Sequence, residues 1–321
     1  MTPTTVLVIE NPASPHLAPL WRQPESVRFI VSDQLEDLEA AAPQADVVMV
    51  AGDPQLLRAV FRKAPRLRWV HSFAAGVESY LFPELVESPV VMTNARGVFK
   101  ESLAEFVMAS ALYFAKDLRR MLRNQEAGVW ERYDVEEIGG KVMGIVGYGA
   151  TGRACAQLAR PFGMTLIGLR RRPERSQGDP LLDRIFGTDR LLELLALSDY
   201  VVLAAPATPA TRKLIGEPEI NAMKREAVLI NVGRGWSVDE AALVHALEAG
   251  RIRGAALDVF ETEPLPAGHA FYRLKNLLLS PHIADHTPDW QALSLLFFLE
   301  NLDRFLRGQP LENIVDKHAG Y

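Results

Sequence analysis

Short apolar runs alternate with amphipathic segments through the first hundred residues. The apolar runs hold consecutive Val, Ile and Leu without in–out alternation, which is typical of strands buried on both faces. The segments at 35–42 and 54–63 instead space their apolar residues as a helix does. We therefore predict a parallel sheet flanked by helices, with strands at Thr5–Ile9, Val27–Val31, Val47–Val50, Trp69–Ser72 and Val90–Met92.

A longer run of helical spacing follows, from Ser102 to about Leu122. Ser102 and Glu105 stand three residues apart at its start, which is the spacing of a capping box. The sequence therefore predicts one long helix that either bridges two domains or forms a subunit contact.

A second alternating series begins at Lys141 and predicts a right-handed, doubly wound sheet. Its strands are expected at Val142–Val146, Thr165–Leu169, Tyr200–Ala205, Ala227–Asn231, Gly254–Asp258 and Leu277–Ser280. The helices between them are expected at Gly152–Phe162, Arg190–Leu197, Glu217–Lys224 and Asp239–Ala249. A last helix, from Asp289 to about Arg307, is expected to return to the first domain. The fold class is then α/β, with two doubly wound parallel-sheet domains: residues 1–98 with 288–321, and residues 99–287.

Composition narrows the class of protein. An apolar fraction of 48% and a charged fraction of 23% are ordinary for a globular protein with a sizeable core. A net charge of -5 gives no basic surface for nucleic acid, and the single Cys155 cannot form an intramolecular disulfide. The N-terminus lacks a basic region, and no apolar run approaches the length of a membrane span. We expect a cytoplasmic protein without a nucleic-acid or membrane partner.

A glycine-rich motif follows the strand expected at Val142–Val146. Gly147, Gly149 and Gly152 fit the GxGxxG pattern and lead into a predicted helix. In that context the glycines allow a tight turn and a close approach of the main chain to a pyrophosphate at the helix N-terminus. The sequence therefore predicts a dinucleotide site, with Tyr148, Gly149, Ala150, Thr151 and Gly152 as cofactor-binding residues.

The next strand ends at Leu169, where an NAD site would place an acidic residue for the ribose 2′-hydroxyl. Arg170, Arg171 and Arg172 stand there instead. A carboxylate would repel a 2′-phosphate, whereas a guanidinium can bind it with two parallel hydrogen bonds. The alternative is a solvated basic loop. We expect NADP as the cofactor, with NAD as the second choice.

Three later segments carry charged side chains directly after strands, where open α/β sheets bind ligands: Asn231–Gly235, Leu257–Pro264 and Ser280–Ala284. Together with the glycine motif, they closely resemble the D-2-hydroxyacid dehydrogenase family, which includes glyoxylate/hydroxypyruvate reductases, phosphoglycerate dehydrogenases and D-lactate dehydrogenases. The resemblance covers nearly the whole chain, because it extends to Ala75–Val77, Ser102–Glu105 and Pro206–Arg212. It implies a Rossmann-type cofactor domain and a flavodoxin-like substrate domain.

The resemblance also implies roles for single residues. Arg234 would hold the substrate carboxylate, His282 would be the acid/base, and Glu263 would pair with His282. The backbone of Ala75, Gly76 and Val77 would form the loop that binds the substrate carboxylate. Substrate binding would therefore involve Ala75, Gly76, Val77, Arg234 and His282, and the cofactor set would extend to Pro206, Thr211, Val232, Gly233, Asp258 and His282.

These residue types suit the reduction of a ketone. Hydride addition places negative charge on the carbonyl oxygen, so a proton donor must stand beside it. An imidazolium can donate that proton near neutral pH, and an adjacent carboxylate raises its pKa and orients the ring. An arginine fork positions the substrate by its carboxylate.

Each assignment has an alternative. Glu261 competes with Glu263, Arg234 could cap a following helix, and Asp258 could be a structural hydrogen-bond acceptor. His282 and His286 have the spacing of metal ligands on a helix, but prolines flank them and no third ligand is evident, so we expect no metal. Glu78, Asp285 and His286 depart from the residues usual in the family. They lie near the site by resemblance and would influence the choice of substrate.

The expected function is an NADP-preferring 2-keto acid reductase, an oxidoreductase with glyoxylate or hydroxypyruvate as the favoured substrate. A formate dehydrogenase is disfavoured, because that relative has glutamine where this chain has Glu263. By resemblance we expect a homodimer that forms through Ser102–Asn124. The alternative function is a dinucleotide-sensing interaction protein that resembles the C-terminal-binding corepressors.

Overall fold

The computed structural model of the protein describes residues 3–321. The chain forms two compact units, one of residues 3–98 with Pro288–Tyr321 and one of Phe99–Thr287. None of the helices formed by the described residues is long and apolar enough to cross a membrane.

The first unit is built on a five-stranded parallel sheet of order β2-β1-β3-β4-β5. This is the flavodoxin-like order, in which the chain reverses direction across the sheet next to the first strand. The strands are β1 (Thr4–Ile9), β2 (Val27–Ser32), β3 (Val47–Val50), β4 (Trp69–Ser72) and β5 (Val91–Asn94).

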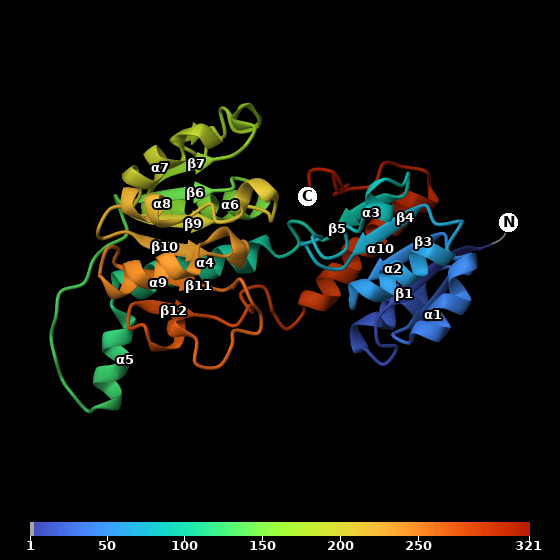
Figure 1. The fold of residues 1–321 in the computed structure, drawn as a ribbon, viewed down its shortest axis with the longest axis horizontal. Coiled ribbons are helices and arrows are strands. Elements are labelled where there is room, and N and C mark those ends of the chain that lie inside the picture. Colours follow the sequence, from blue (N-terminus) through green and yellow to red (C-terminus); the bar gives the residue numbers. More distant parts are fainter. Residues whose placement is uncertain (1–2) are drawn as a thin grey trace. The chain divides into compact units, whose positions relative to one another are not determined.

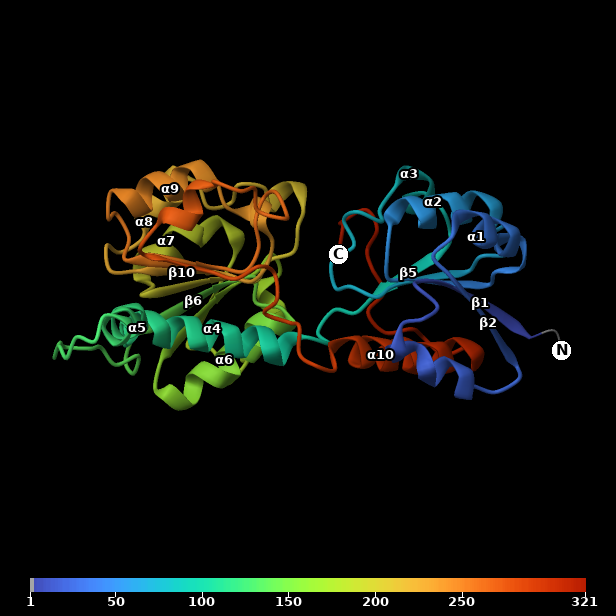
Figure 2. The same cartoon turned by 90° about the horizontal axis from the view of Figure 1, so that it is seen from below.

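Side chains of this sheet alternate between two apolar cores. Val6 and Val8 of β1 pack in the core that includes α10 (Trp290–Leu306), whereas Leu7 and Ile9 pack in the core that includes α1 (Leu35–Ala41) and α2 (Pro54–Lys63). Figure 2 shows α1, α2 and the short α3 (Pro83–Val86) over one face and α10 over the other. The 3-10 helix Pro15–Arg22 packs beside α10.

The second unit holds a seven-stranded parallel sheet of order β12-β11-β10-β9-β6-β7-β8. Counted from β6, this is the Rossmann order with one further strand, and its switch point lies between β6 and β9. The strands are β6 (Val142–Val146), β7 (Thr165–Leu169), β8 (Arg184–Phe186), β9 (Tyr200–Leu203), β10 (Val228–Asn231), β11 (Gly254–Leu257) and β12 (Leu277–Leu279). The two sheets confirm the predicted α/β fold class.

Helices cover both faces of this sheet (Figures 1 and 2). One face carries α7 (Leu191–Leu197), α8 (Glu217–Ala222) and α9 (Glu240–Glu248), and the other carries α4 (Lys100–Ala115) and α6 (Ala150–Ala159). Val202 of β9 and Ile230 of β10 face α4 and α6, while Val201 and Leu229 face the opposite helices. Consecutive strand residues are therefore buried on opposite faces, as the unbroken apolar runs predict.

The long helix predicted from Ser102 to about Leu122 is wrong in two respects. The chain forms α4 and a separate α5 (Leu118–Glu126), because Asp117 adopts a left-handed conformation with φ 47° and its side chain accepts a hydrogen bond from the Arg120 N–H. Ser102 is also no capping residue. It lies inside the first turn of α4, and its hydroxyl donates to the Ala284 carbonyl at 2.5 Å.

Other differences concern short or edge elements. Strand β5 runs from Val91 to Asn94 rather than over Val90–Met92. The sequence did not predict β8, a three-residue edge strand, or the 3-10 helix Pro15–Arg22. Strand β8 contains too few residues to show a period, and the 3-10 helix has a different period from an α-helix and holds Pro19 inside it.

Candidate active site

The turn after β10 positions Arg234. The Asn231 side chain accepts a hydrogen bond from the Gly233 N–H at 3.0 Å and donates to the Arg234 carbonyl at 3.0 Å. The Arg234 guanidinium in turn donates to the Gly233 carbonyl at 2.7 Å. Asn231 thus fixes the backbone from which Arg234 projects. It was not assigned a role from the sequence, although an Asn two residues before a glycine is a signal for this kind of turn.

Asp258, directly after β11, holds the segment that follows β12. Asp258 is only 1% exposed. One of its carboxylate oxygens accepts three hydrogen bonds: from the Ser280 hydroxyl at 2.5 Å, the Ile283 N–H at 2.9 Å and the Ala284 N–H at 3.1 Å. These hydrogen bonds hold residues on both sides of His282 in the sequence. This geometry fits a carboxylate that positions its neighbours, and it therefore favours the interpretation of Asp258 as a structural hydrogen-bond acceptor.

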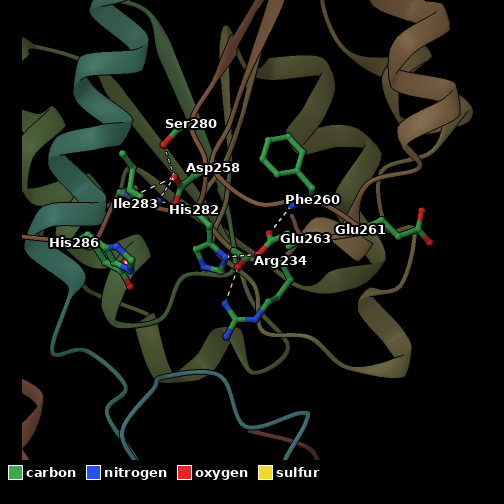
Figure 3. Close-up of polar contacts among 12 residues, drawn as sticks. Arg234, Asp258, Phe260, Glu261, Glu263, Ser280, His282, Ile283 and His286 are labelled. Carbon is green, nitrogen blue, oxygen red and sulfur yellow. Dashed lines mark hydrogen bonds and ion pairs between the residues drawn. The ribbon is translucent and has the colours of Figure 1, made fainter. Parts of the chain in front are cut away.

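His282 and Glu263 form a direct side-chain pair in the site (Figure 3). His282 Nδ1 lies 2.6 Å from Glu263 Oε2, and Glu263 Oε1 accepts from the Phe260 N–H at 2.8 Å. An ionised carboxylate only accepts hydrogen bonds, so Nδ1 carries the proton and Nε2 is the nitrogen that remains for chemistry. His282 has a φ of 56°, a left-handed conformation that is uncommon outside glycine and is held here by the bonds to Asp258.

Carboxylates around His282 stabilise its protonated form. The hydrogen bond that His282 donates to Glu263 raises the pKa of His282, burial opposes this, and the charges of Glu263, Asp258 and Asp285 add to the increase. Burial tends to raise the pKa of Glu263, but hydrogen bonds from His282 and the Phe260 N–H, with the charge of Arg234, lower it overall. The pair is therefore arranged as an imidazolium beside a carboxylate.

The structure distinguishes between the two candidate glutamates. Figure 3 shows Glu263 directed at His282 and Glu261 directed away from it. The Glu261 N–H donates to Glu240 on α9 at 2.8 Å. His286 lies 3.7 Å from Asp285, and residues 3–321 contain no group of three His, Cys, Asp or Glu side chains that could hold a metal ion.

The glycine-rich turn fits a pyrophosphate. Gly147 has a φ of +96°, and a Cβ there would lie 2.5 Å from the Ala205 nitrogen. A Cβ on Gly152 would lie 2.7 Å from the Gly147 carbonyl oxygen, so this glycine lets α6 pack against β6. A Cβ on Gly149 would meet nothing within 4 Å, so the backbone before the first turn of α6 is open to a ligand. Ala150 and Thr151 begin that helix.

The three arginines after β7 differ in their surroundings. The Arg170 guanidinium donates to the Ser176 hydroxyl at 2.6 Å, and Ser176 is buried. Arg171 and Arg172 are exposed. The segment therefore presents cationic side chains to solvent next to the dinucleotide turn, with one of them anchored within its own loop.

The remaining predicted residues lie on loops after strands. Thr211 donates its hydroxyl to the Pro206 carbonyl at 2.8 Å in the loop after β9, and Val232 is buried after β10. In the first unit, the Ala75 carbonyl accepts from the Asn94 side chain at 2.6 Å, Gly76 follows it, and Val77 is buried.

Comparisons with known proteins show the family of the chain. A sequence model described as D-isomer specific 2-hydroxyacid dehydrogenase, NAD binding domain, matches residues 108–284. The chain is 34% identical over 315 residues to a glyoxylate reductase of Korarchaeum cryptofilum, covering 94% of this chain and 90% of that protein. It is 32% identical to a D-3-phosphoglycerate dehydrogenase of Methanocaldococcus jannaschii, covering 88% of this chain but spanning only 53% of that longer protein.

Solved structures are similar along the full length. A 2-hydroxyacid dehydrogenase family protein from Aeromonas salmonicida superimposes with a TM-score of 0.86 at 29% identity, over 98% of this chain and 100% of that one. An NADPH-dependent glyoxylate/hydroxypyruvate reductase from Sinorhizobium meliloti, in complex with NADP and sulfate, superimposes with a TM-score of 0.83 at 27% identity, over 99% and 100% of the two chains.

Proposed function

Because the chain belongs to the D-isomer specific 2-hydroxyacid dehydrogenase family, we propose that it reduces a small 2-keto acid with NADPH as its preferred cofactor. The observation that carries this proposal is the 2.6 Å contact between His282 and Glu263, beside the turn that bears Arg234 (Figure 3). It supplies a proton donor next to a cationic group that can bind a carboxylate.

In this proposal His282 is the acid. Its protonated Nε2 donates to the carbonyl oxygen of the keto acid as negative charge develops there, and Glu263 stabilises the cation before the transfer. In the reverse direction, neutral Nε2 accepts the hydroxyl proton of the 2-hydroxy acid. Asp258 keeps the imidazole in place through the Ser280 hydroxyl before His282 and the Ile283 N–H after it.

In this proposal Arg234 binds the substrate carboxylate. Its guanidinium is oriented by the Gly233 carbonyl and by the turn that Asn231 holds. A bidentate arginine–carboxylate contact would fix the keto carbon in one orientation, which lowers the entropic part of the barrier. The backbone of Ala75, Gly76 and Val77 belongs to the proposed substrate site by family resemblance.

The cofactor site of the proposal is the turn Gly147–Gly152 with the arginines after β7. Bound NADPH would supply the hydride that adds to the keto carbon. The open backbone at Gly149 would take the pyrophosphate, and Arg171 and Arg172 are exposed where a 2′-phosphate is expected. NADP in the similar Sinorhizobium meliloti reductase supports this choice, and so does the absence of an acidic residue directly after β7.

Glyoxylate and hydroxypyruvate are the favoured substrates, since similar proteins are named as reductases of these two acids. The test is the loss of NADPH or NADH absorbance with glyoxylate, hydroxypyruvate, pyruvate and phenylpyruvate. We expect turnover with the two small acids and a higher kcat/KM with NADPH than with NADH. No consumption of either cofactor across the panel would contradict the proposal and favour a dinucleotide-sensing binding protein.

A homodimer completes the proposal, formed through the region that includes α5. None of the residues of α5 is buried, although the helix is amphipathic. Large apolar side chains are exposed on it and on the segment that follows, which is unusual for a monomer: Met121, Leu122, Val129, Trp130 and Val135. Figure 1 shows α5 and this segment extending from the sheet of their unit.

A further inference from the structure

The loop between β7 and β8 carries the three arginines. The Gly147 and Tyr148 N–H groups bond the Leu169 carbonyl just before this loop, and the Asp179 carboxylate ties the far part of the loop to the same turn. Asp179 lies in this loop with its side chain only 13% exposed. Its Oδ2 accepts a hydrogen bond from the Tyr148 hydroxyl at 3.2 Å and another from Arg153 Nε at 3.0 Å. Its Oδ1 accepts from the Leu181 N–H at 3.1 Å. One side chain thus joins the glycine-rich turn, helix α6 and the arginine loop.

Tyr148 makes this connection rigid. It is the residue between the first two glycines of the motif, yet its side chain points inward and the residue is only 2% exposed. A Cβ on Gly168 of β7 would lie 3.2 Å from Tyr148 Cγ, so the ring packs directly on the strand that leads into the arginine loop. The hydroxyl therefore reaches Asp179 from beneath the turn, and the phenol has little freedom to move away.

The arginine loop has a second internal contact. Arg170 donates to Ser176, which is buried, so the start of the loop is folded back on its middle. Asp179 follows three residues later. Arg171 and Arg172 lie between Arg170 and Ser176, so the first contact encloses them, and Asp179 holds the segment directly after it.

Asp179 is unsuited to the role of the acidic residue that binds a ribose hydroxyl in NAD sites. Three donors already occupy its two oxygens, and the positive charge of Arg153 compensates its own. It is therefore an internal partner that need not repel a nearby phosphate.

We propose that Asp179 is a positioning residue for cofactor choice, which holds the arginine loop against the glycine-rich turn so that the 2′-phosphate and pyrophosphate sites are formed together. This inference rests on the proposed preference for NADP. Because Asp179 receives donors from both segments, loosening it removes the ordering of the loop before any ligand binds. The ligand must then supply that ordering itself, which weakens binding.

The test is calorimetric binding of 2′,5′-ADP and of ADP to the full-length protein, which needs no turnover. Asp179→Asn removes the charge, and Tyr148→Phe removes only the hydroxyl that reaches Asp179. We expect each variant to bind 2′,5′-ADP roughly five- to tenfold more weakly, as for the loss of one net hydrogen bond, with at most about a twofold change for ADP. NADPH titrated by its fluorescence should weaken in parallel.

Asp183→Asn is the matched control. Asp183 lies in the same loop and likewise accepts from an arginine, Arg160, and from a backbone N–H, that of Leu166, but it does not contact the glycine-rich turn. This variant should keep the wild-type ratio of the two affinities. The positioning role would be overturned if Asp183→Asn lowered the ratio of 2′,5′-ADP affinity to ADP affinity as much as Asp179→Asn does. It would also be overturned if this ratio were unchanged in both Asp179→Asn and Tyr148→Phe. If the wild-type protein binds the two nucleotides equally, the NADP preference itself is wrong.

Discussion

At the scale of single residues, the pair His282–Glu263 concentrates the chemistry of the site. The two side chains come from segments after different strands, and each is fixed by a backbone contact, Glu263 by the Phe260 N–H and His282 by the bonds of its neighbours to Asp258. Preorganisation of this kind lets the imidazole donate a proton without first reorienting.

Replacing the imidazole tests the proposed acid. His282→Ala should lower kcat for keto-acid reduction by about 10² to 10⁴-fold, because general acid catalysis typically contributes that much. NADPH binding, measured by fluorescence titration, should survive, since the glycine-rich turn does not include His282. Unchanged turnover would remove His282 as the proton donor.

Removal of the Glu263 charge should move the pH dependence. The pKa of His282 lies above its usual 6.5, and reduction needs the protonated ring, so kcat/KM for reduction should fall as the pH rises through that raised pKa. Glu263→Gln removes the main cause of the increase, and the falling limb should therefore move to lower pH. The rising limb of the reverse oxidation should move in the same direction.

Glu261→Gln is the control for this pH profile, since Glu261 is directed away from His282 (Figure 3). It should leave both limbs in place. A Glu263→Gln profile that superimposes on the wild-type one would show that Glu263 does not set the protonation of His282.

A buried histidine in the first unit links stability to pH. His71 is fully buried, its Nδ1 lies 2.8 Å from the Thr93 hydroxyl, and burial lowers its pKa to about 3. Because the unfolded chain binds this proton near pH 6.5, the contribution of neutral His71 is complete above that pH and is lost as the pH falls toward 3. The slope is at most about 1.4 kcal/mol per pH unit.

We therefore expect urea unfolding of the first unit to lose roughly 2 kcal/mol between pH 6.5 and pH 5 on account of His71. His71→Leu should be less stable at neutral pH, because the Thr93 hydroxyl keeps the hydrogen bond from Trp69 Nε1 but loses its contact with the imidazole, and it should show a shallower slope. His245→Gln, a change at an exposed histidine of α9, should keep the slope. Equal slopes in wild type and His71→Leu would contradict this account.

At the scale of elements, β6 and α6 depend on glycines with different functions. Gly152 allows helix and strand to approach, because a Cβ there would lie 2.7 Å from the Gly147 carbonyl oxygen and 2.9 Å from Ile145 Cγ2. At Gly149 the same atom would meet nothing within 4 Å. One glycine is required by the fold, and the other leaves room for a ligand.

Alanine at each position should separate these functions. Gly152→Ala should lower the free energy of unfolding by about 1–3 kcal/mol, because the added methyl group overpacks the contact. Gly149→Ala should keep the stability within about 0.5 kcal/mol, but it should weaken NADPH binding about tenfold or more, since the methyl group occupies the open backbone. Thermal unfolding and NADPH titration of both variants measure this. Wild-type NADPH affinity in Gly149→Ala would contradict the placement of the pyrophosphate.

At the scale of the whole molecule, large apolar side chains of α5 and the following segment are exposed to solvent. Trp130 is 92% exposed. In water such a surface favours association, because each buried Å² of apolar area contributes about 25 cal/mol. The proposed homodimer would cover it.

Trp130→Glu should shift the protein from dimer toward monomer, since a charge would be buried without a partner. Light scattering coupled to size-exclusion chromatography measures the mass. Trp21→Glu is the matched control, because Trp21 is also exposed but belongs to the first unit, and it should not change the mass. A wild-type protein that elutes as a monomer would exclude the dimer.

Much of the fold follows from local sequence patterns. Strands β3, β4, β6 and β7 and helix α2 have the predicted bounds, because apolar runs buried on two faces and helices with one apolar face leave a clear period in the sequence. The break between α4 and α5 at Asp117 is not visible in the sequence pattern. A single residue in the left-handed conformation ends α4, and the apolar spacing continues past it.

The residues of the proposed site were identified by type and by their place after strands, which the sequence by itself determines. The resemblance already paired Glu263 with His282, whereas only the tertiary structure decided that Asp258 meets the backbone of Ile283 and that Asp179 meets Tyr148 beneath the glycine-rich turn. The physical reason is that secondary structure depends on the burial of neighbouring residues, whereas these hydrogen bonds join groups 19 to 31 positions apart. Their partners are set by how the strands order in the sheet and how the loops after them pack.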